Sequence, residues 1–379
     1  METLIDQSYR SVLYLGSWIE TTSASLSFIL TILAVFMMVK SIIGSRQKKS
    51  IPLDAREVPG PIGFPIIGNI LQLGTVPHVS FVELAKKYGD VFRIRIGSRS
   101  VIVLNGRQAI HQALVRQSVD FAGRPGLNAF QTSVALNGGS VAFTTYDEGW
   151  KLHRKIADNA LHHFTSGKQS VLVEQQVTFE ATEFIRFVMN KNNAVIIDPT
   201  KLLKLSVSNI MASFLFQVRH ELDHEELKSI VNNNDLFVDA FSGNNMIDFM
   251  PWLGVIFPGK MKSFTELATK FRNIHKVYIK NHLDNYEHGL DSDIMYYLMT
   301  LSEGIDPKQR QELKLTDERI RSVVYDFFGA GFETVASTLM WAFLYAIYFP
   351  DLQKRMQEEM DDVIGRDRLP SLQTEVDFP

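Results

Sequence analysis

The sequence of 379 residues contains no cysteine. This absence excludes disulfide bridges, thiolate zinc sites, iron–sulfur clusters and a cysteine nucleophile within these residues. The absence of cysteine also fits a folded domain that needs no disulfides and therefore no oxidising compartment. Positive and negative residues nearly balance, so the formal net charge is only −3. No basic surface therefore argues for nucleic acid as a partner.

The hydrophobic pattern predicts a mainly α-helical protein with a small β-sheet near its beginning. Residues 91–96 alternate with period two, and residues 101–104 follow after a turn, which indicates a β-hairpin. After Gly106 the pattern is mostly helical, notably in residues 108–117, 149–163, 174–189 and 264–282. Polar residues at 232–234 and 243–245 predict breaks between helices.

The beginning of the chain is typical of a membrane anchor. Residues 24–43 form an apolar stretch, interrupted by Lys40, that has about the length a bilayer needs, roughly 20 residues. Basic residues follow it and acidic residues precede it, so residues 1–23 are expected in the lumen and the body in the cytosol. A cleaved signal peptide and a buried core helix are alternatives, but a signal peptide carries its positive charge before the apolar run.

A basic, proline-rich linker is predicted at residues 44–68, followed by a catalytic domain at 69–379. Pro52, Pro59, Pro61 and Pro65 in this linker exclude a helix or an inner strand. An ordinary loop and a semi-rigid spacer between membrane and body both fit this composition.

One long helix is predicted from the capping residue Thr316 to Phe349, where Pro350 ends it. Residues 335–349 are apolar on all sides, so we expect them inside the protein. A second membrane span is the alternative, but this run is shorter than a bilayer requires and charged residues precede it.

Residues 330–334 (Ala-Gly-Phe-Glu-Thr) contain two residues that are energetically unfavourable in the middle of a helix. Gly331 in mid-helix costs about 1 kcal/mol relative to alanine, and Glu333 beside an apolar stretch needs a partner. Ala330 and Thr334 are four residues apart and share one face, which leaves room for a ligand beside a hydroxyl. A tight helix crossing with a satisfied threonine explains the same pattern.

These five residues resemble the oxygen-activating helix motif of the cytochrome P-450 family. Five other stretches are similar to that family and occur in its order: residues 58–61 (Val-Pro-Gly-Pro), 121–125 (Phe-Ala-Gly-Arg-Pro), 150–154 (Trp-Lys-Leu-His-Arg), 250–253 (Met-Pro-Trp-Leu) and 350–368. The resemblance covers the chain from about residue 24 to the end. It implies a cytochrome P-450 fold in the endoplasmic reticulum membrane, with a single span and a cytosolic body.

The resemblance implies haem b (iron protoporphyrin IX) as cofactor. Trp150 and Arg154 would bind the haem propionates, since an indole and a guanidinium both donate hydrogen bonds to carboxylates. Ala330, Gly331 and Gly329 would lie by the haem plane, with Gly329 also lining the substrate pocket. A packed tryptophan and a surface arginine are the alternative interpretation of the first pair.

The implied reaction inserts one oxygen atom from O2 into a small hydrophobic substrate. Thr334 would hydrogen-bond the dioxygen, and Glu333 would help to deliver protons. Electrons would come from NADPH through a membrane-bound reductase flavoprotein.

The substrate pocket is suggested by a likeness to family 1, whose members oxidise flat aromatic molecules; families 2 and 17 are similar too. Phe130, Phe237 and Phe241 would form aromatic walls, and Asp326 would line the pocket one turn before Ala330. Planar aromatic and steroid-like molecules are thus the expected substrates. Ordinary core phenylalanines, and an Asp326 that pairs with a neighbouring base, are the alternatives.

Two family elements are absent from the sequence: the Glu-x-x-Arg helix after the long helix, and the loop with the iron-ligating cysteine. The metal ligand is therefore missing, and we expect this chain alone to be inactive. The short pattern occurs at 183–186 and 318–321, where it predicts surface pairs. Two hypotheses remain: an incomplete record of an active monooxygenase, or a non-catalytic, membrane-bound truncated fragment.

Overall fold

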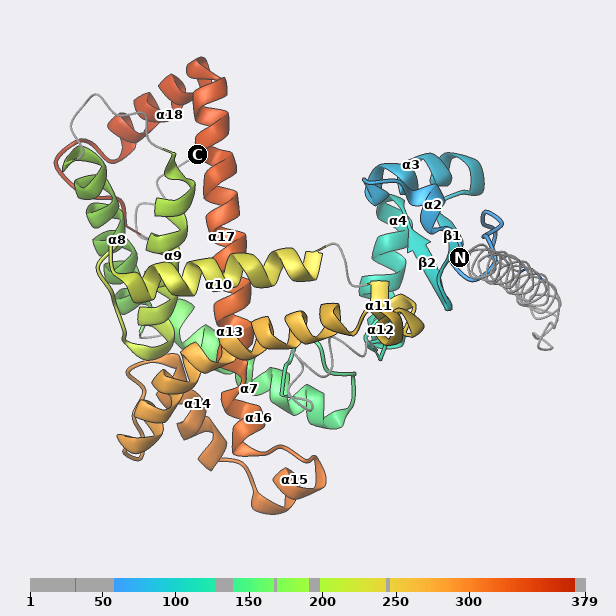
Figure 1. The fold of residues 1–379 in the computed structure, drawn as a ribbon. Coiled ribbons are helices and arrows are strands. Elements are labelled where there is room, and N and C mark those ends of the chain that lie inside the picture. The colour runs from blue at the N-terminus through green and yellow to red at the C-terminus, as the bar shows by residue number, and fades with distance from the viewer. Residues whose placement is uncertain are drawn as a thin grey trace, which may run out of the picture. The chain divides into compact units, whose positions relative to one another are not determined.

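The structure, a computed structural model, describes Thr31 and residues 58–126, 139–166, 169–190, 198–242 and 246–371. The predicted anchor at 24–43, apart from Thr31, lies outside the described residues, as does the linker before residue 58. The chain divides into two compact units, Met1–Ser118 and Val119–Pro379, which are described separately (Figure 1). Together they are mainly helical with a small sheet, as predicted.

The first unit is built around the predicted hairpin. Strands β1 (Val91–Ile96) and β2 (Arg99–Leu104) pair antiparallel, with Val91 opposite Leu104. Alternate side chains of the strands form a small core with Leu73. The helices of this unit are α2 (Ile70–Leu73), α3 (Pro77–Tyr88) and α4 (Gly106–His111), followed by a π-helical turn, η1 (Gln112–Arg116). Helix α5 (Ser118–Phe121) lies at the boundary.

The last part of the predicted linker belongs to this unit. The Arg93 amide donates to the Pro59 carbonyl at 2.7 Å, so the proline-rich segment lies along β1. A Cβ at Gly60 would lie 1.9 Å from the Arg93 carbonyl oxygen, so only glycine fits this approach. Residues 58–68 are therefore held against the sheet and do not act as a free spacer.

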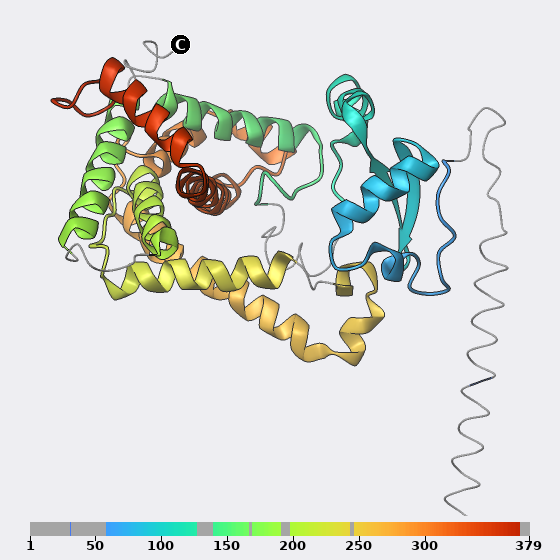
Figure 2. The ribbon, with the colours of Figure 1, turned by 90° about the horizontal axis from the view of Figure 1, so that it is seen from above.

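The second unit is helical, and α17 (Val323–Tyr348) runs through it (Figure 1). Its principal partner is α9 (Pro199–Phe216). Figure 2 looks almost along α17, with α7 (Glu148–Thr165) and α10 (Glu225–Ser242) on opposite sides. The other long helices are α8 (Ser170–Asn190), α13 (Pro258–Asp284), α14 (Ile294–Glu303) and α18 (Pro350–Val363). The shorter ones are α11 (Met246–Phe249), α12 (Trp252–Ile256), α15 (Pro307–Glu312) and α16 (Asp317–Arg321).

The predicted long helix is two helices. Thr316 caps α16 as expected, because its hydroxyl accepts from the Arg319 amide at 3.1 Å. Ser322 then separates α16 from α17. Its hydroxyl lies 2.6 Å from the carbonyl oxygens of both Arg319 and Gly139, which ties the break to the segment before α7.

The prediction that residues 335–349 lie inside the protein is wrong for the described chain. Ala336 is buried, but Trp341 is 60% exposed and Tyr348 is 74% exposed. The described helices pack along only part of this half of α17, which leaves apolar side chains uncovered. Among the described residues, Asp317–Tyr348 is the one stretch long and apolar enough to cross a membrane, which by itself is weak support for a span.

An aromatic core surrounds His275 of α13. Its ring lies 4.4 Å from that of Phe328 and 4.8 Å from that of Phe271, measured between centroids. Nδ1 donates to the Phe271 carbonyl at 2.9 Å. Burial lowers the pKa of His275 to about 4, although that hydrogen bond favours the charged ring. The histidine is therefore neutral in the folded protein at pH 7.

We expect His275 to make the fold sensitive to acid. The pKa of His275 in the folded protein lies below its unfolded value of about 6.5. Its contribution to the free energy of unfolding is therefore complete above pH 6.5 and declines as pH falls toward 4. The loss is on the order of 3 kcal/mol. Urea unfolding of His275→Phe at pH 7 and pH 5 should show a smaller drop in stability than the original chain. Equal drops in both proteins would contradict this role.

Candidate active site

Thr334 and Ala330 share an open face of α17. Both residues are exposed, and the Thr334 hydroxyl donates to the Ala330 carbonyl at 2.6 Å. Thr338, one turn later, donates to the Thr334 carbonyl at 2.8 Å. Helical spacing places Trp341 on the same side, and it too is exposed. The face combines small residues, hydroxyls and apolar rings, and the predicted pairing of Ala330 with Thr334 is present.

Glu333 points to a different side of the helix, into a polar network with α9 and α10. Its carboxylate accepts from Asn234 at 3.1 Å and from Ser337 at 3.4 Å, and lies 3.6 Å from the Lys204 ammonium. Lys204 also donates to Asp235 at 2.6 Å. The partner that Glu333 was expected to need is therefore present, on α9 and α10.

Lys204 stays charged in this network. Burial opposes its charge, but the hydrogen bond to Asp235 and the charge of Glu333 outweigh that cost, so the pKa of Lys204 lies above its usual value. Sequence reasoning missed Lys204 and Asn234. The signal for Lys204 was its position between Leu203 and Leu205, which are both buried, whereas Lys201 at the start of the same stretch is exposed.

Gly331, which was predicted to lie beside a cofactor, is close to Met211 of α9. A Cβ there would lie 2.7 Å from both Cε and Sδ of Met211. The glycine therefore lets the two helices approach closely, the alternative that its sequence already allowed.

Gly329 lies beside an aromatic group that includes Phe237. A Cβ at Gly329 would sit 4.0 Å from Cζ of Phe271, an ordinary contact. Phe271 stacks on Phe237 of α10 with 5.5 Å between ring centroids, and Phe237 also stacks on Phe264 at 6.0 Å. Two residues predicted to line the pocket are thus linked through α13.

Two of the predicted pocket phenylalanines cannot be placed in this way. Phe130 lies outside the described residues, and Phe241 is placed only by its backbone in α10.

Trp150 and Arg154 occupy the first turns of α7. The Asp147 side chain caps this helix by accepting from the Trp150 amide at 2.6 Å. The Trp150 indole donates to the Val141 carbonyl at 2.7 Å, and the Arg154 guanidinium lies over the indole ring at 5.6 Å. Arg154 is half exposed, and among the described residues its further partner is Asp158, at 3.4 Å. Its guanidinium therefore remains accessible, whereas the indole N–H is already bonded.

Asp326, which was predicted to line a substrate pocket or to pair with a base, is held by the segment before α7. Its carboxylate accepts from the Ser140 hydroxyl at 2.7 Å and from the Val141 and Ala142 amides at 2.6 and 3.4 Å. Burial raises the pKa of Asp326, and these hydrogen bonds offset that only in part. Among the described residues no base pairs with Asp326, and both oxygens of its carboxylate accept hydrogen bonds. Asp326 connects α17, through Val141, to Trp150.

The described residues fit a flat prosthetic group in part. The exposed face of Ala330 and Thr334 can receive an apolar ring, and Arg154 can donate to a carboxylate. An iron atom would find no thiolate, because the sequence contains no cysteine.

Comparison with known proteins decides which family this architecture represents. The family described as "Cytochrome P450" matches residues 58–379. The chain belongs to the cytochrome P450 family. The match begins where the proline-rich segment joins β1, so it includes both described units.

Curated relatives confirm the likeness to family 1. The chain is 34% identical over 354 residues to cytochrome P450 1A5 of Gallus gallus, covering 91% of this chain and 66% of the relative. It is 36% identical over 338 residues to cytochrome P450 1A1 of Rattus norvegicus, covering 87% and 64%. For cytochrome P450 1A1 of Homo sapiens the identity is 34% over 341 residues, covering 88% and 66%. The chain thus spans about two thirds of the length of these relatives.

Proposed function

We propose that the protein is a haem-dependent monooxygenase that inserts one oxygen atom from O2 into a small hydrophobic substrate. The observation that carries this proposal is the open face of α17, on which Thr334 and Ala330 present a hydroxyl and a small side chain. Family membership supports haem b as the group that occupies this face. These 379 residues contain no cysteine that would supply a thiolate to the iron, so we expect the chain by itself to be inactive.

Each residue around this face has a separable task. Arg154 would hold a haem propionate, and Trp150 would orient that arginine through its ring. Ala330 leaves room for the macrocycle. When bound, haem supplies the binding and reductive activation of O2. Thr334 would hold a proton near the oxygen with its hydroxyl, after rotating away from the Ala330 carbonyl.

Glu333 would pass protons toward that hydroxyl from its network on α9 and α10. We expect Glu333→Gln to lower the turnover of the haem-loaded protein roughly tenfold to a hundredfold, because an amide cannot carry the proton. The amide can still bond to Asn234 and Ser337, so the urea midpoint should move little. A variant with normal turnover and a much lower midpoint would show that Glu333 only supports the fold.

We propose planar aromatic molecules as the first substrate class to test, with steroid-like molecules second. Phe237 belongs to an aromatic group with Phe264 and Phe271 near Gly329, and aromatic side chains favour planar ligands. Phe241 and Phe130 would extend this group. Asp326 is not assigned to it, because its carboxylate is occupied.

The proposed setting is the endoplasmic reticulum membrane. Residues 24–43 would form one span, and the body would face the cytosol, where a reductase flavoprotein delivers electrons from NADPH. The relatives' family supports this setting, and the apolar stretch in the sequence gives the anchor its physical basis.

The test is product formation by the protein expressed from its full coding sequence, in membranes with the reductase. A planar polycyclic arene and a steroid of similar size are offered separately. NADPH-dependent hydroxylation of the arene, faster than that of the steroid, is the expected result. No oxidised product from either, in a preparation shown to contain haem, would overturn the proposal.

A further inference from the structure

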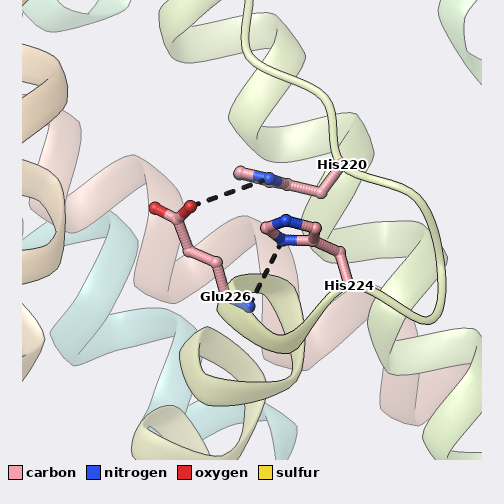
Figure 3. A group of neighbouring side chains, drawn as sticks. All are labelled: His220, His224 and Glu226. Carbon is pink, nitrogen blue, oxygen red and sulfur yellow. Dashed lines mark hydrogen bonds and ion pairs between the residues drawn. The ribbon is translucent and has the colours of Figure 1, made fainter.

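Three metal-binding side chains converge on the connection between α9 and α10, away from the open face of α17. His220 and His224 lie in this connection, and Glu226 lies in the first turn of α10 (Figure 3). One potential ligand atom from each lies within 4.8 Å of the other two, and within the described part of the chain no second group of three does so. We propose that these residues form a zinc site with three protein ligands, with water in the fourth position.

The distances are close to those of a zinc site. Zinc binds histidine nitrogen and carboxylate oxygen at about 2.0–2.2 Å, which places the ligands of a tetrahedral ion roughly 3.4 Å apart. His220 Nδ1 lies 4.0 Å from Glu226 Oε2. Closing the site therefore takes movements of roughly 1 Å. His224 and Glu226 are exposed, so their side chains can make these movements without disturbing the core.

Tyr278 of α13 prepares two of the three ligands. Its hydroxyl donates to Glu226 Oε1 at 2.7 Å and lies 3.2 Å from His220 Nε2. Because the single hydroxyl proton goes to Glu226, the oxygen accepts from His220 Nε2–H, which leaves the lone pair on Nδ1 facing Glu226 Oε2. Partners of this kind fix the tautomer and orientation of metal ligands.

His224 can serve as the third metal ligand because its present interactions are weak. Its ring stacks on that of His220 with 5.2 Å between centroids, and the exposed His224 ring has to turn before its nitrogen lone pair points at the same ion. Nδ1 accepts only a long hydrogen bond, 3.3 Å, from the Glu226 amide. A metal ion therefore competes with a weak interaction for this ring.

The surrounding charge favours a cation. Residues 221–226 (Glu-Leu-Asp-His-Glu-Glu) contain four carboxylates and neither lysine nor arginine. Arg219, which precedes His220 in the chain, is already compensated, since it donates to Glu180 at 2.7 Å and to Glu221 at 2.9 Å. Lys228 likewise donates to Glu225 at 2.7 Å. Two imidazoles with one carboxylate suit zinc better than calcium or magnesium, which prefer oxygen ligands.

Calorimetric titration of the untagged, metal-stripped full chain with zinc chloride tests the proposal. We expect one zinc ion per chain and a higher thermal midpoint when zinc is present. His224→Ala, a change at an exposed ring, should weaken zinc binding at least about tenfold and leave the zinc-free midpoint unchanged. Glu226→Gln, which keeps the acceptor for Tyr278, should weaken it similarly.

His288→Ala is the matched control. His288 lies against Glu303 as an exposed histidine–carboxylate pair with no second histidine, so its loss should not change zinc binding. Absence of stoichiometric zinc binding by the original chain would overturn the site. Unchanged affinity in both His224→Ala and Glu226→Gln would also overturn it, because the zinc would then be held elsewhere.

Discussion

Replacing Thr334 by alanine is expected to reduce product formation about 100-fold or more in the haem-loaded protein. The hydroxyl lies on the open face of α17 beside Ala330. We propose that it is the group that holds a proton near the bound oxygen. Without it, reducing equivalents from NADPH should leave as hydrogen peroxide, O2 taking up two electrons and two protons. Product, peroxide and NADPH consumption are measured together.

Two variants separate this role from a general effect on the helix. Thr334→Ser keeps the hydroxyl and should retain most of the activity. Thr338→Ala removes an equivalent hydroxyl one turn later, which also donates to a backbone carbonyl of α17, and should change product formation little. Similar losses in Thr334→Ala and Thr338→Ala would show that the hydroxyl at 334 has no special part.

Replacing Asp326 by alanine should have the largest effect on stability, a loss of about 3 kcal/mol. The change removes the acceptor for the Ser140 hydroxyl and for the amides of Val141 and Ala142. Those donors would remain partly buried without partners. Because Val141 also accepts from the Trp150 indole, the start of α7 should loosen as well. Urea unfolding gives the loss directly.

Asp326→Asn is the matched control. The amide oxygen of the asparagine can still accept from Val141, and its amide nitrogen can donate to Ser140. We therefore expect about half of the stability loss of Asp326→Ala, or less. Haem affinity should fall in the same order, from the original chain to Asp326→Asn to Asp326→Ala, because Trp150 and Arg154 lie at the start of α7. An alanine variant as stable as the original chain would contradict the link between α17 and α7.

Local patterns predicted the parts of the structure that depend on neighbouring residues. The hairpin follows from period-two alternation in residues 91–96, and the start of α16 follows from the side chain of Thr316. The shared face of Ala330 and Thr334 follows from helical spacing alone. These features need no information about distant parts of the chain.

Distant contacts account for what the sequence did not show. Residues 232–234 were predicted to break a helix, yet they lie within α10, where buried Asn234 donates to Glu333, 99 residues away. Gly331 is explained by Met211, and Asp326 by a segment about 185 residues earlier. The exposure of residues 335–349 likewise depends on which helices pack beside them. Composition and periodicity do not encode these partners.

Isotope labelling tests the central claim most directly. The protein expressed from its full coding sequence is supplied with reductase, NADPH and a planar arene under oxygen-18 gas in ordinary water. The proposed monooxygenase incorporates one oxygen-18 atom into each hydroxylated product, and Thr334→Ala should greatly reduce its yield. Product whose new oxygen comes from water, or no oxidised product from a haem-loaded preparation, would contradict the assignment.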